Sequence, residues 1–204
     1  MLSRGSVRGR PAEAQIDHAS RQLAQRANLR VADAQALPFP DSTFDVVASA
    51  LVINFIPDRP RALAEMRRVA RACGIVAGYV WDFAAELGPT WPLRRGLRQI
   101  GADIRQVPGT EDSSLGALNS LFEQARFERI ACRPIDVTVR YPDFDDFWQA
   151  QTPSYNPVTK MIAAMTKTER VRLIEAVRAG LLVCQDGRIE YSARANAIKA
   201  CVRG

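Results

Sequence analysis

Small and polar residues stand where two expected strands end, and their types suit the binding of a ligand. Asp33 and Ala34 follow a short apolar stretch, and Ser49 and Ala50 lie near the end of the apolar run Phe44–Val52. In open α/β sheets, ligands bind outside the carboxyl ends of the strands. A carboxylate and a hydroxyl at such an edge can accept hydrogen bonds from a polar ligand.

The sequence offers no constellation for covalent or metal-assisted catalysis. The only histidine, His18, falls on an expected helix, away from the strand ends. Cys73, Cys132, Cys184 and Cys201 are isolated from one another, which predicts reduced structural thiols and neither a zinc site nor a disulfide framework. We therefore predict no catalytic side chain and no metal ligand.

Alternating strands and helices are expected to position the strand-end residues. After a short strand at Leu29–Ala32, the apolar run Phe44–Val52 predicts a strand that is covered on both faces. Arg59–Ala72 predicts a helix that ends at Gly74, and Ile75–Trp81 predicts a further buried strand. This order indicates a doubly wound α/β fold.

The second half continues the pattern with longer connections. The expected elements are a helix at Ser114–Ala125, a strand around Arg129–Val139, a helix that ends near Gly180 and a strand at Ile189–Cys201. Thr166 and Glu169 predict a capping box for the helix that ends near Gly180. The aspartates of YPDFDDFW alternate with aromatic residues, which favours a strand-to-helix junction over a metal loop.

Three motifs point to one family. The stretch RVADAQALPFPDSTFDVVASALVINF is followed by the turn RACG at Arg71–Gly74 and by YVWDF at Tyr79–Phe83. Together they resemble the class I S-adenosylmethionine-dependent methyltransferases, and more narrowly the ubiquinone/menaquinone C-methyltransferase group with its methyltransferase type 11 domain. The resemblance implies a Rossmann-like sheet, the cofactor S-adenosyl-L-methionine and a small-molecule methyl acceptor.

The resemblance also implies roles for the strand-end residues. Asp33 and Ala34 look like the family's adenine pair, in which the carboxylate accepts a hydrogen bond from the exocyclic amine. The alternative is a strand-end aspartate that caps the following turn. Ser49 and Ala50 look like residues that line the cofactor, and Asn54 stands where relatives often carry a histidine near the acceptor.

We expect the end of the next strand and two insertions to form the site that binds the methyl acceptor. Trp81 and Asp82 look like residues that face the acceptor cleft, and a half-buried core tryptophan is the alternative for Trp81. Residues 82–111 and 151–188 are expected to form small helical caps over this cleft. Because the sulfonium is already activated, holding the acceptor in line and dry supplies most of the catalysis.

Two family features are missing from the first residues of the chain. No GxGxG motif brings the backbone close to the cofactor, and Arg10 stands where relatives carry a ribose-binding acid. We therefore expect an N-terminally truncated relative, with a disordered basic tail over residues 1–10 and a partial methyltransferase domain over 11–204. The sheet would lack its first strands and the Gly-rich loop.

This truncation has consequences for partners and for activity. The strand at Leu29–Ala32 would lose its neighbours, and the strand at Phe44–Val52 would keep a free apolar edge that invites pairing. We expect that edge to support a homodimer or to bind a complementing chain. Cofactor binding by this chain is expected to be impaired, and the alternative function is a non-catalytic pseudo-methyltransferase interaction module.

Composition limits the remaining function classes. The 204 residues are 47% hydrophobic and 25% charged, as in one soluble domain. The net charge of +6 comes from scattered arginines without a run of four basic residues, which makes a nucleic-acid partner unlikely. No apolar stretch suits a membrane span or a secretory signal, so we expect a cytoplasmic protein without membrane contact.

Overall fold

The chain divides into two compact units. The structure, a computed structural model, describes residues 2–3, 16, 19–21, 27–154 and 156–204. The first unit comprises Met1–Val80, Pro108–Pro134 and Asn196–Gly204, and the second comprises Trp81–Val107 and Ile135–Ala195. Most of both expected cap segments belongs to the second unit.

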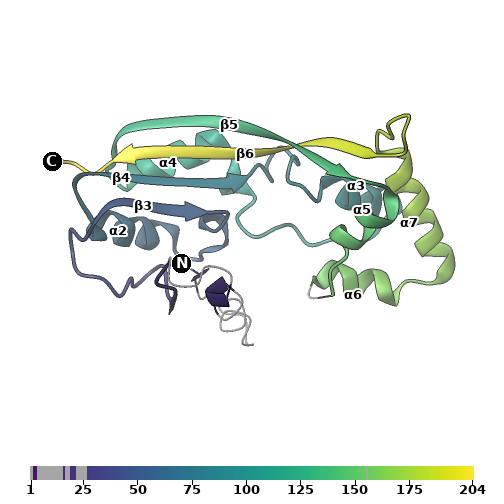
Figure 1. Ribbon diagram of the computed structural model, residues 1–204, viewed down its shortest axis with the longest axis horizontal. Coiled ribbons are helices and arrows are strands. Elements are labelled where there is room, and N and C mark those ends of the chain that lie inside the picture. The colour runs from purple at the N-terminus through teal and green to yellow at the C-terminus, as the bar shows by residue number, and fades with distance from the viewer. Residues whose placement is uncertain (1, 4–15, 17–18, 22–26, 155) are drawn as a thin grey trace. The chain divides into compact units, whose positions relative to one another are not determined.

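A four-stranded sheet with the order β3–β4–β6–β5 organises the first unit (Figure 1). Its strands are β3 (Phe44–Ala50), β4 (Ala70–Trp81), β5 (Glu128–Tyr141) and β6 (Ile189–Cys201), of which residues 135–141 and 189–195 belong to the second unit. Strands β3 and β4 are parallel, with Val47 opposite Val76, and β6 runs against its neighbours. The expected α/β class with a Rossmann-like sheet is confirmed.

Two helices cover one face of this sheet. Helix α2 (Arg59–Val69) begins at Asp58, whose side chain accepts from the N–H of Arg61, and α4 (Leu115–Gln124) begins at Ser114 in the same manner. Such caps satisfy amides that have no partner within the helix. The fully buried core side chains between helices and sheet include Leu63, Leu118, Phe122, Val76 and Val80.

The opposite face of the sheet is open to solvent, which contradicts the prediction that the Phe44–Val52 strand is covered on both faces. Val46 is 57% exposed, and the β4 residues Ile75 and Tyr79 are 38% and 41% exposed. Side chains alternate along a strand, so these residues point away from the face that α2 and α4 cover. The apolar run predicts a strand, but it does not indicate which face of that strand is packed.

The end of α2 also differs from the prediction. The helix stops at Val69 and β4 starts at Ala70, so Gly74 lies inside the strand and does not end the helix. Cys73 has a φ of 59°, and the register between β3 and β4 shifts at this point. An added Cβ at Gly74 would lie 2.8 Å from the carbonyl oxygen of Arg71, so the bend favours glycine.

A second, two-stranded sheet joins distant parts of the sequence. Strand β1 (Leu2–Ser3) lies parallel to β2 (Val31–Ala32). The prediction that the strand at Leu29–Ala32 has no neighbour is therefore wrong. The rest of the expected tail, with Arg10, and the histidine His18 lie outside the described residues. The outer edge of β3 pairs with no described strand.

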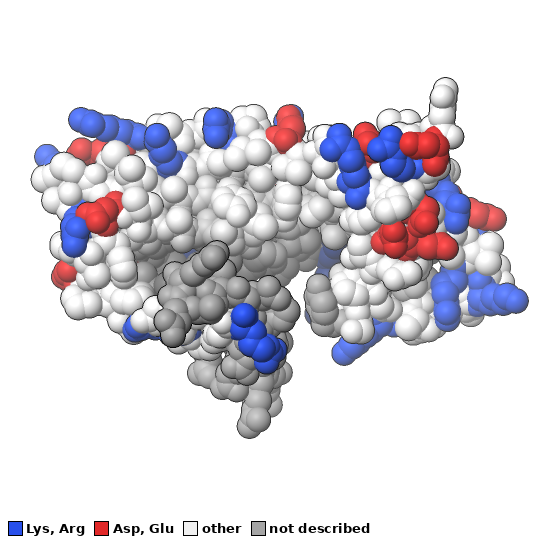
Figure 2. Space-filling view, in the orientation of Figure 1, with Lys and Arg blue, Asp and Glu red and all other residues white. Residues whose placement is uncertain are grey.

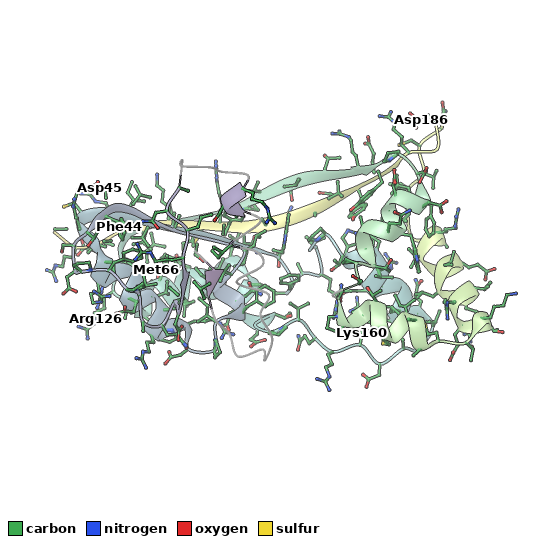
Figure 3. All side chains as sticks on the ribbon, turned by 60° about the horizontal axis from the view of Figure 1, so that its bottom comes forward. Phe44, Asp45, Met66, Arg126, Lys160 and Asp186 are labelled. Atoms are coloured by element: carbon green, nitrogen blue, oxygen red, sulfur yellow. The ribbon has the colours of Figure 1, made fainter. Side chains whose placement is uncertain are left out.

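Helices dominate the second unit. They are α3 (Trp91–Gln99), α5 (Phe144–Gln151), α6 (Pro157–Ala164) and α7 (Lys167–Ala179). The capping box of Thr166 and Glu169 and the helix end at Gly180 are confirmed, as is the junction at Asp143, which caps α5. The turn at Asp186, labelled in Figure 3, leads into β6 with the predicted bounds.

Candidate functional site

The carboxyl end of β3 turns sharply into a short helical segment. Leu51 adopts a φ of 56°, and its N–H donates to the carbonyl of Tyr79 on β4 at 2.8 Å. The 3-10 turn η2 (Ile53–Phe55) follows and leads to the cap of α2. This left-handed residue redirects the chain at the strand end, which is where ligands bind in this fold class.

Asn54, an expected acceptor-site residue, lies in this turn and is only 2% exposed. Its Nδ2 donates to the carbonyl oxygen of Pro108 at 3.1 Å. Its Oδ1 has no hydrogen-bond partner among the described residues. Asn54 therefore holds the segment that precedes α4 and keeps one buried acceptor oxygen unused.

The segment 108–114 is held against η2 by further polar contacts within the first unit. Arg59 forms an ion pair with Asp112, in the 3-10 turn η3 (Glu111–Ser113). Asn196 of β6, 1% exposed, donates from Nδ2 to the carbonyl of Ser113 at 2.8 Å. Gly109, with a φ of 65°, packs directly on the carbonyl of Asn54. These contacts fix the segment 108–114 beside the carboxyl end of β3.

Asp33 occupies the end of β2 and takes part in a local turn. Its Oδ1 accepts from the N–H of Gln35 at 2.9 Å, and its carbonyl accepts from the N–H of Ala36 at 3.1 Å. Its Oδ2 has only a long contact of 3.5 Å with the amide of Gln35. The carboxylate thus caps the turn with one oxygen and keeps the other largely available, and Ala34 lies next to it, partly buried.

Ser49 and Ala50 line an open hollow of about 580 Å³ on the first unit. Small residues of β3, β4, β5 and β6 line the hollow, and Tyr79 of β4 lines it as well. Both residues therefore lie on accessible surface near the carboxyl end of β3. No hydrogen bond among the described residues joins them to the Asp33–Ala34 pair.

Trp81 and Asp82 belong to the second unit, where Asp82 has a structural role. Asp82 is buried, its Oδ1 accepts from the N–H of Ala85 at 3.0 Å, and its own N–H donates to the carbonyl of Arg194 at 2.8 Å. Trp81 is half-buried at the end of β4. Asp82 thus fixes the turn that follows the strand.

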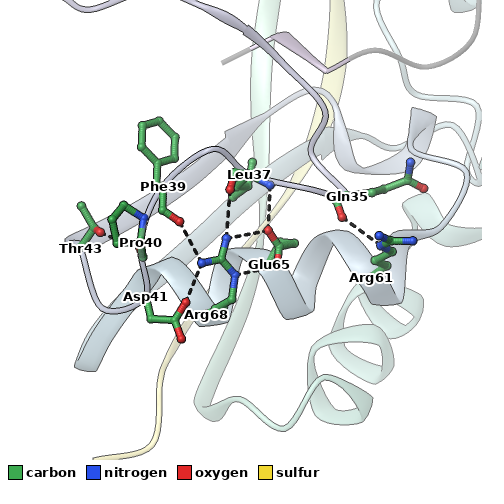
Figure 4. A network of polar contacts seen from close by, with 9 residues as sticks. All are labelled: Gln35, Leu37, Phe39, Pro40, Asp41, Thr43, Arg61, Glu65 and Arg68. Atoms are coloured by element: carbon green, nitrogen blue, oxygen red, sulfur yellow. Dashed lines mark hydrogen bonds and ion pairs between the residues drawn. The ribbon is translucent and has the colours of Figure 1, made fainter.

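Arg68 fastens the loop between β2 and β3 to helix α2 (Figure 4). Its guanidinium donates to the carbonyls of Leu37 and Phe39 at 3.0 and 2.8 Å, and it pairs with Asp41 and Glu65 at 2.7 Å. Glu65 in turn accepts from the N–H of Leu37 at 2.7 Å. This network sets where the chain leaves Asp33 and enters β3.

The network predicts a pH-dependent contribution to stability. The hydrogen bond from Arg68 holds the pKa of Glu65 below its ordinary value of 4.5, although partial burial opposes this. A carboxyl with a lowered native pKa stabilises the fold above its unfolded pKa, and this stabilisation is lost as the pH falls through the native pKa. We expect Glu65→Gln to lower the free energy of unfolding at pH 7 by about 1 kcal/mol.

Urea unfolding at pH 7 and at about pH 3 tests this expectation. The difference between Glu65→Gln and the unchanged chain should shrink at the lower pH, because Glu65 is then protonated in the unfolded chain and begins to be protonated in the folded one. Glu123→Gln is the matched control, since that side chain lies on α4 outside the network. An equal loss at both pH values would contradict the role of the Glu65 charge.

The described residues form neither a metal-binding cluster nor a membrane-spanning helix. Within them, no three His, Cys, Asp or Glu side chains lie close enough together to hold a metal ion. In the same part of the chain, no helix combines the length and the apolar character that crossing a bilayer requires.

The mixed α/β architecture with its four-stranded sheet is similar to the Rossmann-like fold of methyltransferases. The YcgJ protein of Bacillus subtilis has a TM-score of 0.52 and 17% identity, and the match covers 95% of this chain and 78% of that chain. A proposed methyltransferase of Bacillus halodurans has a TM-score of 0.51 and 14% identity, with 94% and 80% covered. Residues 8–78 match the methyltransferase domain family. The family match covers about a third of this chain, and the likeness to the two solved structures shows the fold.

Curated relatives share segments with this chain and differ in activity. The mitochondrial arginine-hydroxylase NDUFAF5 of Rattus norvegicus is 32% identical over 114 residues, which are 55% of this chain and 32% of that protein. The phosphatidylethanolamine N-methyltransferase of Cereibacter sphaeroides is 39% identical over 72 residues, 35% of each protein. The chain thus spans about a third of the length of these relatives, so acceptor and reaction do not follow from the match.

The residues that hold the segment 108–114 against η2 were not predicted from the sequence. Gly109, Arg59 and Asn196 contact η2 or η3 from positions far apart in the chain. The Pro108-Gly109 dipeptide is a turn signal that could have drawn attention to the segment. Nothing local to Asn196 indicated its role, because its partner is 83 positions away.

Proposed function

We propose that this chain carries the adenine side and part of the acceptor side of an S-adenosylmethionine-dependent methyltransferase that acts on a small molecule. The proposal depends mainly on one observation, the Oδ2 of Asp33, which lies at the end of β2 beside Ala34 and has only a long contact with the amide of Gln35. A carboxylate oxygen there can accept a hydrogen bond from the exocyclic amine of adenine, and alanine leaves space for the ring.

The remaining candidate residues would serve in positioning. Ser49 and Ala50 would lie along the cofactor, and the buried Oδ1 of Asn54 would take a hydrogen bond from a polar group at the acceptor side. S-adenosylmethionine, when bound, supplies an already activated methyl group, so this chain has only to orient the reactants and exclude water.

We further propose that this chain by itself binds the cofactor weakly. The 204 residues contain no GxGxG motif for the methionine end of the cofactor. In addition, Asp33 already gives Oδ1 to the turn at Gln35. The second candidate function, a non-catalytic interaction module, is favoured by the solvent-exposed face of the sheet at Val46 and Tyr79.

An NMR titration with S-adenosylhomocysteine tests the adenine site even when binding is weak. We expect saturable shifts of the amides of residues 33–35 and 49–51 at ligand concentrations of about 1 mM or above. Adenosine alone should shift residues 33–35, because it carries the ring that Asp33 would bind.

Matched carboxylate variants make the test specific. Asp33→Asn should abolish the shifts at residues 33–35. Asp103→Asn should leave them unchanged, since Asp103 is an exposed carboxylate of the second unit. An unaltered titration in Asp33→Asn, or shifts confined to other residues, would contradict the proposed adenine site.

A further inference from the structure

The open face of the first unit's sheet has a chemistry of its own. We use the term open face for the side chains that point away from α2 and α4, namely Val46, Ala48, Ala50, Ile75, Ala77, Tyr79, Ala131, Arg133, Ala197 and Lys199. Their neighbours Val47, Val76, Cys132 and Ile198 pack into the core, and strand alternation places the open-face residues on the other side. The open face contains the hollow of about 580 Å³.

The open face has an apolar half and a cationic half. Strands β3 and β4 contribute the exposed apolar side chains Val46, Ile75 and Tyr79. Strands β6 and β5 contribute Lys199 and Arg133, which line the hollow and form no ion pair within the described part of the chain. In Figure 2, the surface over β4 and β6 is largely uncharged, with Lys and Arg side chains along its upper border.

Alanines form the floor between the two halves. Ala48, Ala77, Ala131 and Ala197 each come from a different strand of the sheet and line the same hollow. Short side chains let another element approach the sheet backbone closely, and no carboxylate lies in the hollow's lining. An element that covers this floor would bury apolar surface and would meet unpaired positive charge along one side.

We propose that the open face binds an amphipathic α-helix of another protein whose apolar stripe is flanked on one side by Glu or Asp. The apolar stripe would lie over Val46, Ile75 and Tyr79, and the acidic flank would face Lys199 and Arg133. This inference goes beyond the proposed methyl transfer and does not require bound cofactor, although the helix would cover the hollow that Ser49 and Ala50 line.

Charge complementarity selects this occupant over a second copy of the chain. Two copies that met through the open face would bring Lys199 and Arg133 of both into the same interface, and the hollow's lining offers no acid to pair with them. Like charges that meet at an interface oppose association. An acidic helix instead neutralises both cations and covers the apolar half.

Two synthetic helical peptides of about 18 residues test the proposal with the intact chain. Both carry the same leucine and alanine stripe, and they differ only in a flank of Glu or a flank of Lys. Fluorescence anisotropy of the labelled peptides should show that the Glu peptide binds at least about tenfold more tightly at low salt, and that added salt weakens it.

Charge reversal then locates the site. The double variant Arg133→Glu/Lys199→Glu should lose about tenfold in affinity for the Glu peptide and gain affinity for the Lys peptide. The matched control Lys160→Glu/Lys167→Glu changes two exposed lysines of the second unit and should behave as the unchanged chain. The gain for the Lys peptide shows that the first variant is folded.

Three results of the peptide experiments would overturn the proposal. They are equal binding of both peptides, no binding of the Glu peptide by the chain, and an unaltered preference in the charge-reversed variant. Sedimentation of the chain alone gives the fourth, because a dimer that Tyr79→Asp dissociates would assign the open face to a second copy.

Discussion

Gly109→Ala is expected to lower the free energy of unfolding by about 3 kcal/mol, the largest effect that the structure predicts for a single methyl group. Gly109 is buried, and its φ of 65° lies in the left-handed region that side chains disfavour. An added Cβ would also collide with the carbonyl carbon and oxygen of Asn54. Because both groups are backbone, neither can rotate away, and the contact between η2 and the segment 108–114 has to open.

Gly101→Ala is the matched control for backbone strain. Gly101 has a φ of 80°, yet an added Cβ there would meet no atom within 4 Å. Urea denaturation should therefore give a loss of only about 1 kcal/mol for Gly101→Ala. If Gly109→Ala cost no more than Gly101→Ala, the close packing of Gly109 on Asn54 would be contradicted.

Gly96→Ala is expected to destabilise the second unit by about 2 kcal/mol, although alanine normally favours a helix. Gly96 lies on α3, and an added Cβ would overlap Cγ2 of Val177 on α7 and approach its backbone N at 3.3 Å. The glycine thus allows these two helices to lie close together. Gly116→Ala on α4, where nothing stands within 4 Å, should instead stabilise by about 0.5–1 kcal/mol.

A double-mutant cycle separates overlap from other causes. Val177→Ala removes the methyl group that the new Cβ would meet, so Gly96→Ala/Val177→Ala should lose less stability than the sum of the single losses. A coupling of about 1 kcal/mol or more is expected for residues in contact. Additive losses would show that Gly96 and Val177 do not touch in solution.

Local chemistry explains which elements could be predicted from the sequence. The last strand, Ile189–Cys201, and the capping box of Thr166 and Glu169 appear where expected, because turn residues and cap residues act on their immediate neighbours. The family motifs around Asp33 and Ser49 are also local, and the roles that they imply for these residues remain predictions. Their order along the chain indicated the parallel sheet that β3 and β4 form.

Features that depend on distant contacts could not be predicted. The apolar run at Phe44–Val52 does not show whether a helix lies on each face, and only one face is packed. The end of α2 at Val69 depends on pairing between strands, with Thr43 donating to the carbonyl of Val69 at 2.8 Å. The roles of Asn54 and Asn196 depend on partners that lie 54 and 83 positions away.

The most direct test of the proposed function is isothermal titration calorimetry of the purified chain with S-adenosylhomocysteine. Because one oxygen of Asp33 is engaged with Gln35 and no GxGxG motif is present, we predict a Kd of about 1 mM or weaker, lost in Asp33→Ala. A Kd near 1 µM for the 204-residue chain would contradict the impaired cofactor site, and the same affinity in Asp33→Ala would contradict the adenine assignment itself.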